Sequence, residues 1–141
     1  MELQLYFYHH EINMSPKAIF STINNDEKLL NTVKKLTDIE YINSTSGTRE
    51  AGTRGILQYN DNPVEAEIVQ YRPDRRIEVE LEIPAGTLVT MFNIVPVEDR
   101  SEVTISVKLL TDSAVSFALY ALKIPAVKKQ FNEDMKRLEG N

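Results

Sequence analysis

The sequence predicts an α+β fold in which a curved antiparallel sheet of about seven strands wraps around a long, kinked C-terminal helix. Two short helices are expected after the first strand. The prediction rests first on Thr111 to Asn141, where apolar side chains recur at steps of three and four residues and form one stripe of a helix. It rests second on the alternating runs upstream, which follow one another at hairpin spacing. A helix with such a stripe needs a large sheet to cover it, and we expect space for a small apolar molecule between the two.

Length and composition indicate one ordinary globular unit. The chain has 141 residues, so we expect a single domain over residues 1–141. It contains no cysteine, which excludes disulfides and thiolate metal sites and suits a reducing compartment. Met1 is not followed by a basic and apolar leader, and no apolar run reaches the roughly 18 residues that span a bilayer. We therefore expect a cytoplasmic protein without an integral membrane segment.

The net charge of −5 argues against nucleic acid as a partner. A general phosphate-binding surface needs an excess of Lys and Arg. Basic residues gather only locally, at Arg72 to Arg76 and along the last helix. We expect no nucleic-acid partner.

The first strand is expected at Leu3 to Ile12, with a twist or bulge near His9 because the more apolar side changes along it. Ser15 and Pro16 are a typical N-cap and first residue of a short helix, and Asp26 is expected to cap a second one. Residues 45–52 are expected to form a loop. The later strands are predicted at residues 38–44, 53–59, 64–71, 77–83, 87–95 and 103–109.

The last helix contains Pro125, which removes a hydrogen bond and costs about 3 kcal/mol in a straight helix. The apolar periodicity nevertheless continues to Leu138, so one kinked helix is predicted. Before Pro125 the helix is apolar on two faces, since Val115, Leu119 and Leu122 add a second stripe. A helix that is apolar on two sides is buried on both, or meets a ligand or a partner.

At this point the order of elements resembles the START/Bet v 1-like (SRPBCC) helix-grip superfamily, in its polyketide cyclase/dehydrase-like branch. The resemblance implies a helix-grip fold with a cavity for hydrophobic ligands or lipids between sheet and helix, and it implies no particular catalysis. The matching phrases are Ile12–Phe20, Gly52–Gly55, Tyr71–Ile77 and Asn93–Val97.

No pattern for a metal, a cofactor or a nucleophile is present. His9 and His10 are adjacent on a strand and point to opposite faces, so they cannot share an ion; one is expected at the surface and one partly buried. General acid–base catalysis by His10 with Glu67 or Glu80 would require strand pairing to bring the histidine next to one of these carboxylates. Those glutamates alternate with apolar residues and should face water. The residues therefore favour a binding protein over an enzyme.

The cavity lining is predicted from the inward sides of the helix and the strands. Ligand sites are mostly apolar with a few polar groups, and tyrosine hydroxyls suit that role. The same aromatic stripe is also what an ordinary packed core shows. The candidates are Phe117, Tyr120, Ala121 and Ile124 on the helix, Thr90 and Phe92 on the sixth strand, Tyr8 or His10 on the first, and Tyr59 or Tyr71 from the middle of the sheet.

Three functions remain open on the sequence. The first is binding of a small hydrophobic or amphipathic molecule. The second is a polyketide cyclase/dehydrase-like enzyme that uses a buried histidine or tyrosine. The third is an interaction module in which the apolar segment from Val115 to Leu122 packs on a client protein or on a second copy in a homodimer.

Overall fold

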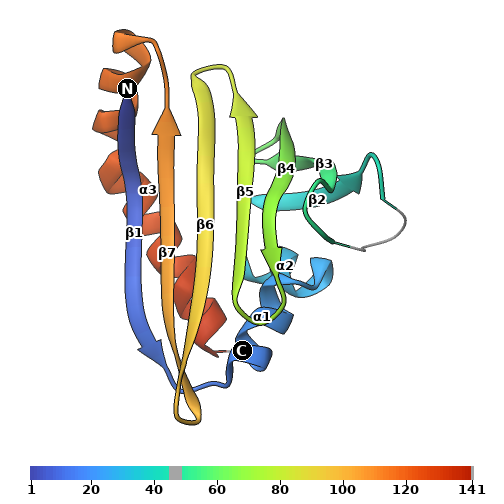
Figure 1. Cartoon of the computed structure of the whole chain (residues 1–141). Helices are drawn as coiled ribbons and strands as arrows, with labels where there is room; N and C mark the ends of the chain where they lie inside the picture. The colour runs from blue at the N-terminus through green and yellow to red at the C-terminus, as the bar shows by residue number, and fades with distance from the viewer. Residues whose placement is uncertain (45–48, 141) are drawn as a thin grey trace.

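The computed structural model describes residues 1–44 and 49–140, and it confirms the predicted fold class. Seven antiparallel strands form one curved sheet in the order β1-β7-β6-β5-β4-β3-β2, and the long helix α3 lies on one side of it (Figure 1). The strands are β1 (Glu2–Ile12), β2 (Leu36–Tyr41), β3 (Arg54–Tyr59), β4 (Asn62–Arg72), β5 (Arg76–Ile83), β6 (Gly86–Val97) and β7 (Arg100–Leu110).

Two short helices, α1 (Pro16–Ile23) and α2 (Asp26–Thr32), connect β1 to β2. Ser15 caps α1 as predicted: its hydroxyl oxygen accepts a hydrogen bond from the Ala18 amide at 3.2 Å. The cap of α2 is Asn25 and not the expected Asp26. The Asn25 side-chain oxygen accepts from the Lys28 amide at 2.9 Å, which leaves Asp26 in the first turn, where a carboxylate interacts favourably with the helix dipole.

The irregularity in β1 lies at Leu5, and the expected position near His9 was wrong. The pairing with β7 shifts between Gln4 and Tyr6, so Leu5 is an extra residue on β1. The shift lets Leu5 and Tyr6 both be buried, at 3% and 2% exposure, while Phe7 points away from the core. The bulge at Leu5 therefore explains why residues on both sides of this strand are apolar in the sequence.

Strand β2 begins and ends earlier than predicted. It starts at Leu36, which is buried and pairs with Tyr59 of β3, and it ends at Tyr41. The pairing with β3 decides these bounds, because the sequence around them alternates only weakly. Of the loop predicted at residues 45–52, residues 45–48 lie outside the described part of the chain.

The two faces of the sheet differ in polarity. On the face toward α3, here called the concave face, β7 contributes a row of buried apolar side chains from Val103 to Leu109. On the opposite, convex face, Glu78, Glu80 and Glu82 alternate with the apolar residues of β5, as predicted.

Helix α3 (Ala114–Gly140) continues through Pro125 as one helix. It packs against β1 and reaches α2 near its C-terminus (Figure 1). The C-terminal part is the better buried, with Met135 at 6% and Leu138 at 1% exposure. The grip of the sheet on the helix is therefore tightest at the end near α1 and α2.

Candidate functional site

The space between the concave face and α3 is filled at one end. Ile77, Phe92 and Ile94 face this end from β5 and β6, and all three are buried. Ile19 and Phe20 of α1 are buried against the same core. The short helices therefore seal the interior on the side where β4 turns into β5.

Toward the other end, near the turn between β5 and β6, the packing is incomplete. Leu81 and Leu88 are paired neighbours in the concave register, yet each is only half-buried. The facing residues of α3 behave in the same way: Phe117, Tyr120 and Ile124 are half-buried, unlike Met135 and Leu138 further along the helix. Apolar side chains thus face the interior from both sides without being closed off from water.

Two tyrosines of β1 join the sheet to α3. The Tyr6 ring stacks on Phe131 with centroids 4.9 Å apart, and its hydroxyl donates to Asn132 Oδ1 at 2.8 Å. The Tyr8 hydroxyl donates to Glu139 Oε1 at 2.5 Å. Burial, with the charges of Asp134 and Glu139 adding to it, raises the pKa of Tyr6 from 10.0 to about 12. Burial and the hydrogen bond to Glu139 also raise the pKa of Tyr8. Both hydroxyls therefore stay protonated and act as donors.

Tyr59, at the end of β3, presents a third hydroxyl to the interior. Burial raises its pKa, and the carboxylate of Asp134 on α3 adds to that effect. Within residues 1–44 and 49–140, the Tyr59 hydroxyl has no hydrogen-bond partner. It is a donor that the fold itself does not use.

Asp134 is the buried carboxylate of this region, at 3% exposure. It forms an ion pair with Arg137 and accepts a hydrogen bond from Gln130 Nε2 at 3.2 Å. Arg137 in turn donates to the Thr32 carbonyl of α2 at 2.8 Å. These contacts hold α3 against α2 and occupy the carboxylate, so Asp134 is a structural group and not a free base.

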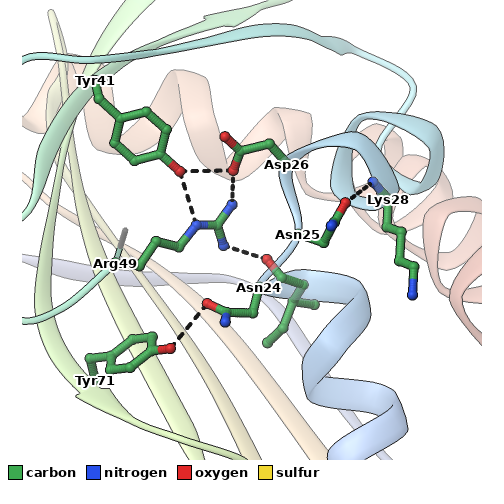
Figure 2. A network of polar contacts seen from close by, with 8 residues as sticks. Asn24, Asn25, Asp26, Lys28, Tyr41, Arg49 and Tyr71 are labelled. Atoms are coloured by element: carbon green, nitrogen blue, oxygen red, sulfur yellow. Dashed lines mark hydrogen bonds and ion pairs between the residues drawn. The ribbon is translucent and has the colours of Figure 1, made fainter. Parts of the chain in front are cut away.

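A second polar cluster ties the segment after β2 to the junction of α1 and α2, and Figure 2 shows its contacts. The Arg49 guanidinium donates to the Ile23 carbonyl at 2.5 Å and to the Tyr41 hydroxyl at 3.1 Å, and it forms an ion pair with Asp26. The Tyr41 hydroxyl also donates to Asp26 Oδ1 at 2.8 Å. Burial raises the pKa of Tyr41. Each polar group has a partner, so this cluster fastens the fold.

Hollows open on the outside of the described part of the chain, and two of them contain none of the residues predicted to line a cavity. One, of about 470 Å³, lies where Met1, Gly86 and Leu110 meet at the end of the sheet. The other, of about 220 Å³, lies on the convex face among glutamates of β4 and β5. Both are surface depressions away from the interior between sheet and helix. Over the described residues, no group of His, Cys, Asp and Glu could hold a metal, and no helix could cross a membrane.

Known structures share this architecture, although no family model and no curated protein matches the sequence. Ara h 8.0201, of the Bet v 1 family, superposes with a TM-score of 0.68 at 12% identity, covering 99% of this chain and 97% of that one. A hypothetical protein from Helicobacter pylori gives a TM-score of 0.74 at 12% identity, with 96% and 86% covered. DynU16, from the dynemicin biosynthetic locus, gives 0.66 at 7% identity and is itself covered over 45% of its length, against 94% of this chain.

The chain has the Bet v 1-like helix-grip fold. At identities this low the likeness concerns the fold alone. The order of elements, the curved sheet and the long terminal helix are the features that the superpositions share.

Within the helix-grip fold, the predicted residues fall into three groups. Tyr8 and Phe92 are buried in the core. Tyr71 is half-buried and engaged, because its hydroxyl donates to Asn24 Oδ1 at 3.2 Å (Figure 2). Its ring also meets the Phe20 ring edge-on. The half-buried residues that face the incompletely packed region are Thr90 on β6 and Phe117, Tyr120, Ala121 and Ile124 on α3. Tyr59 is half-buried as well, but it lies at the end of β3 near Asp134, toward the better-buried part of α3.

The expectation for the histidines was wrong. Both are exposed, and neither is partly buried. His9 lies on the convex face against Thr104 and Glu102, at 2.8 Å from each. His10 stacks on Tyr8 with centroids 4.6 Å apart.

The acid–base pairing proposed for His10 also fails. Glu67 and Glu80 are cross-strand neighbours of each other on the convex face of β4 and β5. His10 lies in the concave register of β1, at the opposite part of the sheet. The glutamates face water, as their alternation predicted.

Sequence reasoning missed Tyr6, Asp134 and Arg49. Tyr6 shares a strand face with Tyr8, so a signal existed, but the bulge at Leu5 obscured which side was buried. Asp134 and Arg49 gave no signal, because a single charged residue in a polar stretch is usually solvated. The role of Arg49 depends on contacts across the fold, and that of Asp134 depends on Arg137, which reaches the Thr32 carbonyl of α2.

Proposed function

We propose that this helix-grip protein binds a small hydrophobic or amphipathic molecule, such as a lipid, between the concave face and the first half of α3. One observation carries the proposal: Leu81 and Leu88 on the sheet and Phe117 and Ile124 on the helix face the interior and remain half-exposed. Apolar area removed from water contributes about 25 cal/mol per Å². The chain's own packing leaves this apolar area partly in contact with water. A ligand that fills the region would bury it, and the burial would contribute to the free energy of binding.

The Tyr59 hydroxyl, which the fold does not use as a donor, suggests which polar group such a ligand carries. Its hydroxyl stays protonated and has no partner among the described residues, so it can donate to a carbonyl or hydroxyl oxygen. The nearby carboxylate of Asp134 disfavours an anionic group at this place. An amphipathic molecule with a neutral acceptor therefore suits the region best.

The chemistry of the interior favours binding over catalysis. The three tyrosines have raised pKa values and are poor bases, and Asp134 is engaged by Arg137. The absence of cysteine suits a protein of the reducing cytoplasm, which is where we place this function.

Fluorescence titration with Nile red, a neutral apolar dye with a carbonyl acceptor, tests the proposal. We expect saturable binding by the wild-type protein. Ala121→Phe adds a ring on the half-buried side of α3 and should weaken binding about tenfold, since added bulk in a packed site costs about 1–3 kcal/mol. Tyr59→Phe should weaken it about fivefold, as loss of one hydrogen bond does.

The matched control is Leu119→Asp, which changes the exposed side of the same helix. Its affinity for Nile red should equal that of the wild type. If Leu119→Asp abolishes binding while Ala121→Phe does not, the dye binds outside and the proposed site is wrong. Absence of saturable binding by the folded wild type would also refute it.

A further inference from the structure

The outer side of α3 carries an apolar stripe that nothing in the chain covers. Val115, Leu119 and Leu122 lie one helical turn apart and are 69%, 54% and 80% exposed. Ala126 continues the stripe by one further turn and is also exposed. We call these four residues the α3 stripe. We propose that it docks onto the surface of an anionic lipid bilayer.

The charges around the α3 stripe favour an anionic surface. Lys123, Lys128 and Lys129 are exposed along the middle of the helix, and Lys128 lies on the side away from the stripe. From Ala114 to Asn132 the sequence has no acidic residue, although the whole chain carries a net charge of −5. Helical spacing places Lys123 and Lys129 on opposite flanks of the stripe. An apolar stripe flanked by lysines is the pattern of helices that lie in a membrane interface, where the long side chains reach the headgroups.

The distribution of acidic residues supports the same orientation. Glu65, Glu67, Glu78, Glu80 and Glu82 share the convex face of β4 and β5, on the opposite side of the sheet from α3 (Figure 1). An anionic bilayer repels that face and attracts the lysines of α3. The electrostatic field of these glutamates and lysines therefore favours the orientation in which the α3 stripe faces the membrane.

A second copy of the chain fits the α3 stripe less well. Pairing two stripes would bring lysines of one helix beside those of the other, and the next carboxylate along this side of the helix, that of Glu133, lies two turns beyond Ala126. Lipid phosphates supply the missing negative charge. The docking does not depend on the proposed ligand site, because it uses the opposite side of the helix.

Co-sedimentation with extruded vesicles tests the docking. One set consists of phosphatidylcholine, and the other has a third of that lipid replaced by phosphatidylserine. We expect the wild type to bind the anionic vesicles more tightly than the neutral ones, and less so at high salt. Leu122→Asp should reduce binding at least about tenfold, because it places a charge at the apolar contact. Lys123→Gln and Lys129→Gln should each reduce it about fivefold.

Val95→Asp is the matched control, since Val95 is an exposed apolar residue, at 46%, on the convex face. It should bind anionic vesicles as the wild type does. The proposal is overturned if the wild type does not bind anionic vesicles, or if Leu122→Asp and Val95→Asp bind equally. It is also overturned if analytical ultracentrifugation shows a dimer that Leu122→Asp dissociates while vesicle binding is absent, since the stripe would then meet a second copy.

Discussion

Arg49 shows at the scale of one residue how a buried charge can organise a segment. Its side chain is 9% exposed, and its three donor positions reach Ile23, Asp26 and Tyr41. A guanidinium can serve three partners in one plane, which an ammonium cannot. The residue therefore links the chain after β2 to the start of α2 (Figure 2).

Replacing Arg49 by methionine should lower the free energy of unfolding by about 2–3 kcal/mol, because the Ile23 carbonyl and Asp26 lose their partner in a buried place. Urea denaturation measures the change. Arg72→Met, at an exposed position, is the control and should stay within about 0.5 kcal/mol of the wild type. Equal effects of the two substitutions would show that the Arg49 contacts contribute no stability.

The raised pKa of Tyr6 predicts how the free energy of unfolding depends on pH. The pKa of its hydroxyl has the ordinary tyrosine value of 10.0 in the unfolded chain and rises to about 12 in the folded chain. Between these values the unfolded chain has already released the proton, so the free energy of unfolding falls as pH rises above 10. Tyr8, Tyr41 and Tyr59 act in the same direction.

Urea denaturation at several pH values checks this prediction. We expect constant stability up to about pH 9 and a steep decrease above pH 10, and Tyr6→Phe should make that decrease shallower. A decrease of the same steepness in Tyr6→Phe would mean that this hydroxyl is not the group that titrates.

At the scale of elements, the turn between β5 and β6 depends on Gly86. Its φ is +148°, and a Cβ atom built there would lie 2.1 Å from the Leu110 carbonyl oxygen of β7. The carbonyl oxygen of Leu110 is a backbone atom and cannot move aside as a flexible side chain could. Gly86→Ala should therefore lower the free energy of unfolding by about 3 kcal/mol or more.

Gly52→Ala separates this clash from backbone strain alone. Gly52 also has a positive φ, of +92°, but nothing lies within 4 Å of the added methyl group. Its cost should be about 1 kcal/mol. Thermal unfolding of both variants decides the matter: equal costs would contradict a steric role for Gly86.

The elements were predictable where one periodicity dominates. The stripe from Phe117 to Leu138 predicted α3, and the alternation of Ile77 to Ile83 predicted β5. Prediction failed in β1, where the bulge buries both Leu5 and Tyr6, and for the bounds of β2, which pairing with β3 decides. Both failures come from contacts between strands, which a single strand's pattern does not contain.

For the whole molecule, the sequence predicted the arrangement of the sheet and α3 better than it predicted the polar contacts between the elements. The inward side of α3 followed from helical spacing: Tyr120 and Ile124 pack against the core, and Phe117 is half-buried on the same side. The polar groups did not follow, because Tyr6 and Arg49 acquire partners only when β1 meets α3 and the segment after β2 meets α2, and Arg137, the partner of Asp134, reaches Thr32 only when α3 meets α2. Separations of up to 126 residues join these pairs, and no local pattern encodes them.

The most direct measurement of the central claim is a map of amide chemical shifts during titration with methyl octanoate, an apolar chain with a neutral carbonyl acceptor. If the ligand binds between the concave face and α3, saturable changes will centre on Tyr59, Leu81 and Leu88 of the sheet and on Phe117 to Ile124 of α3. Changes that centre on the glutamates of the convex face or on the hollow beside Met1, or no saturable change at all, would contradict it.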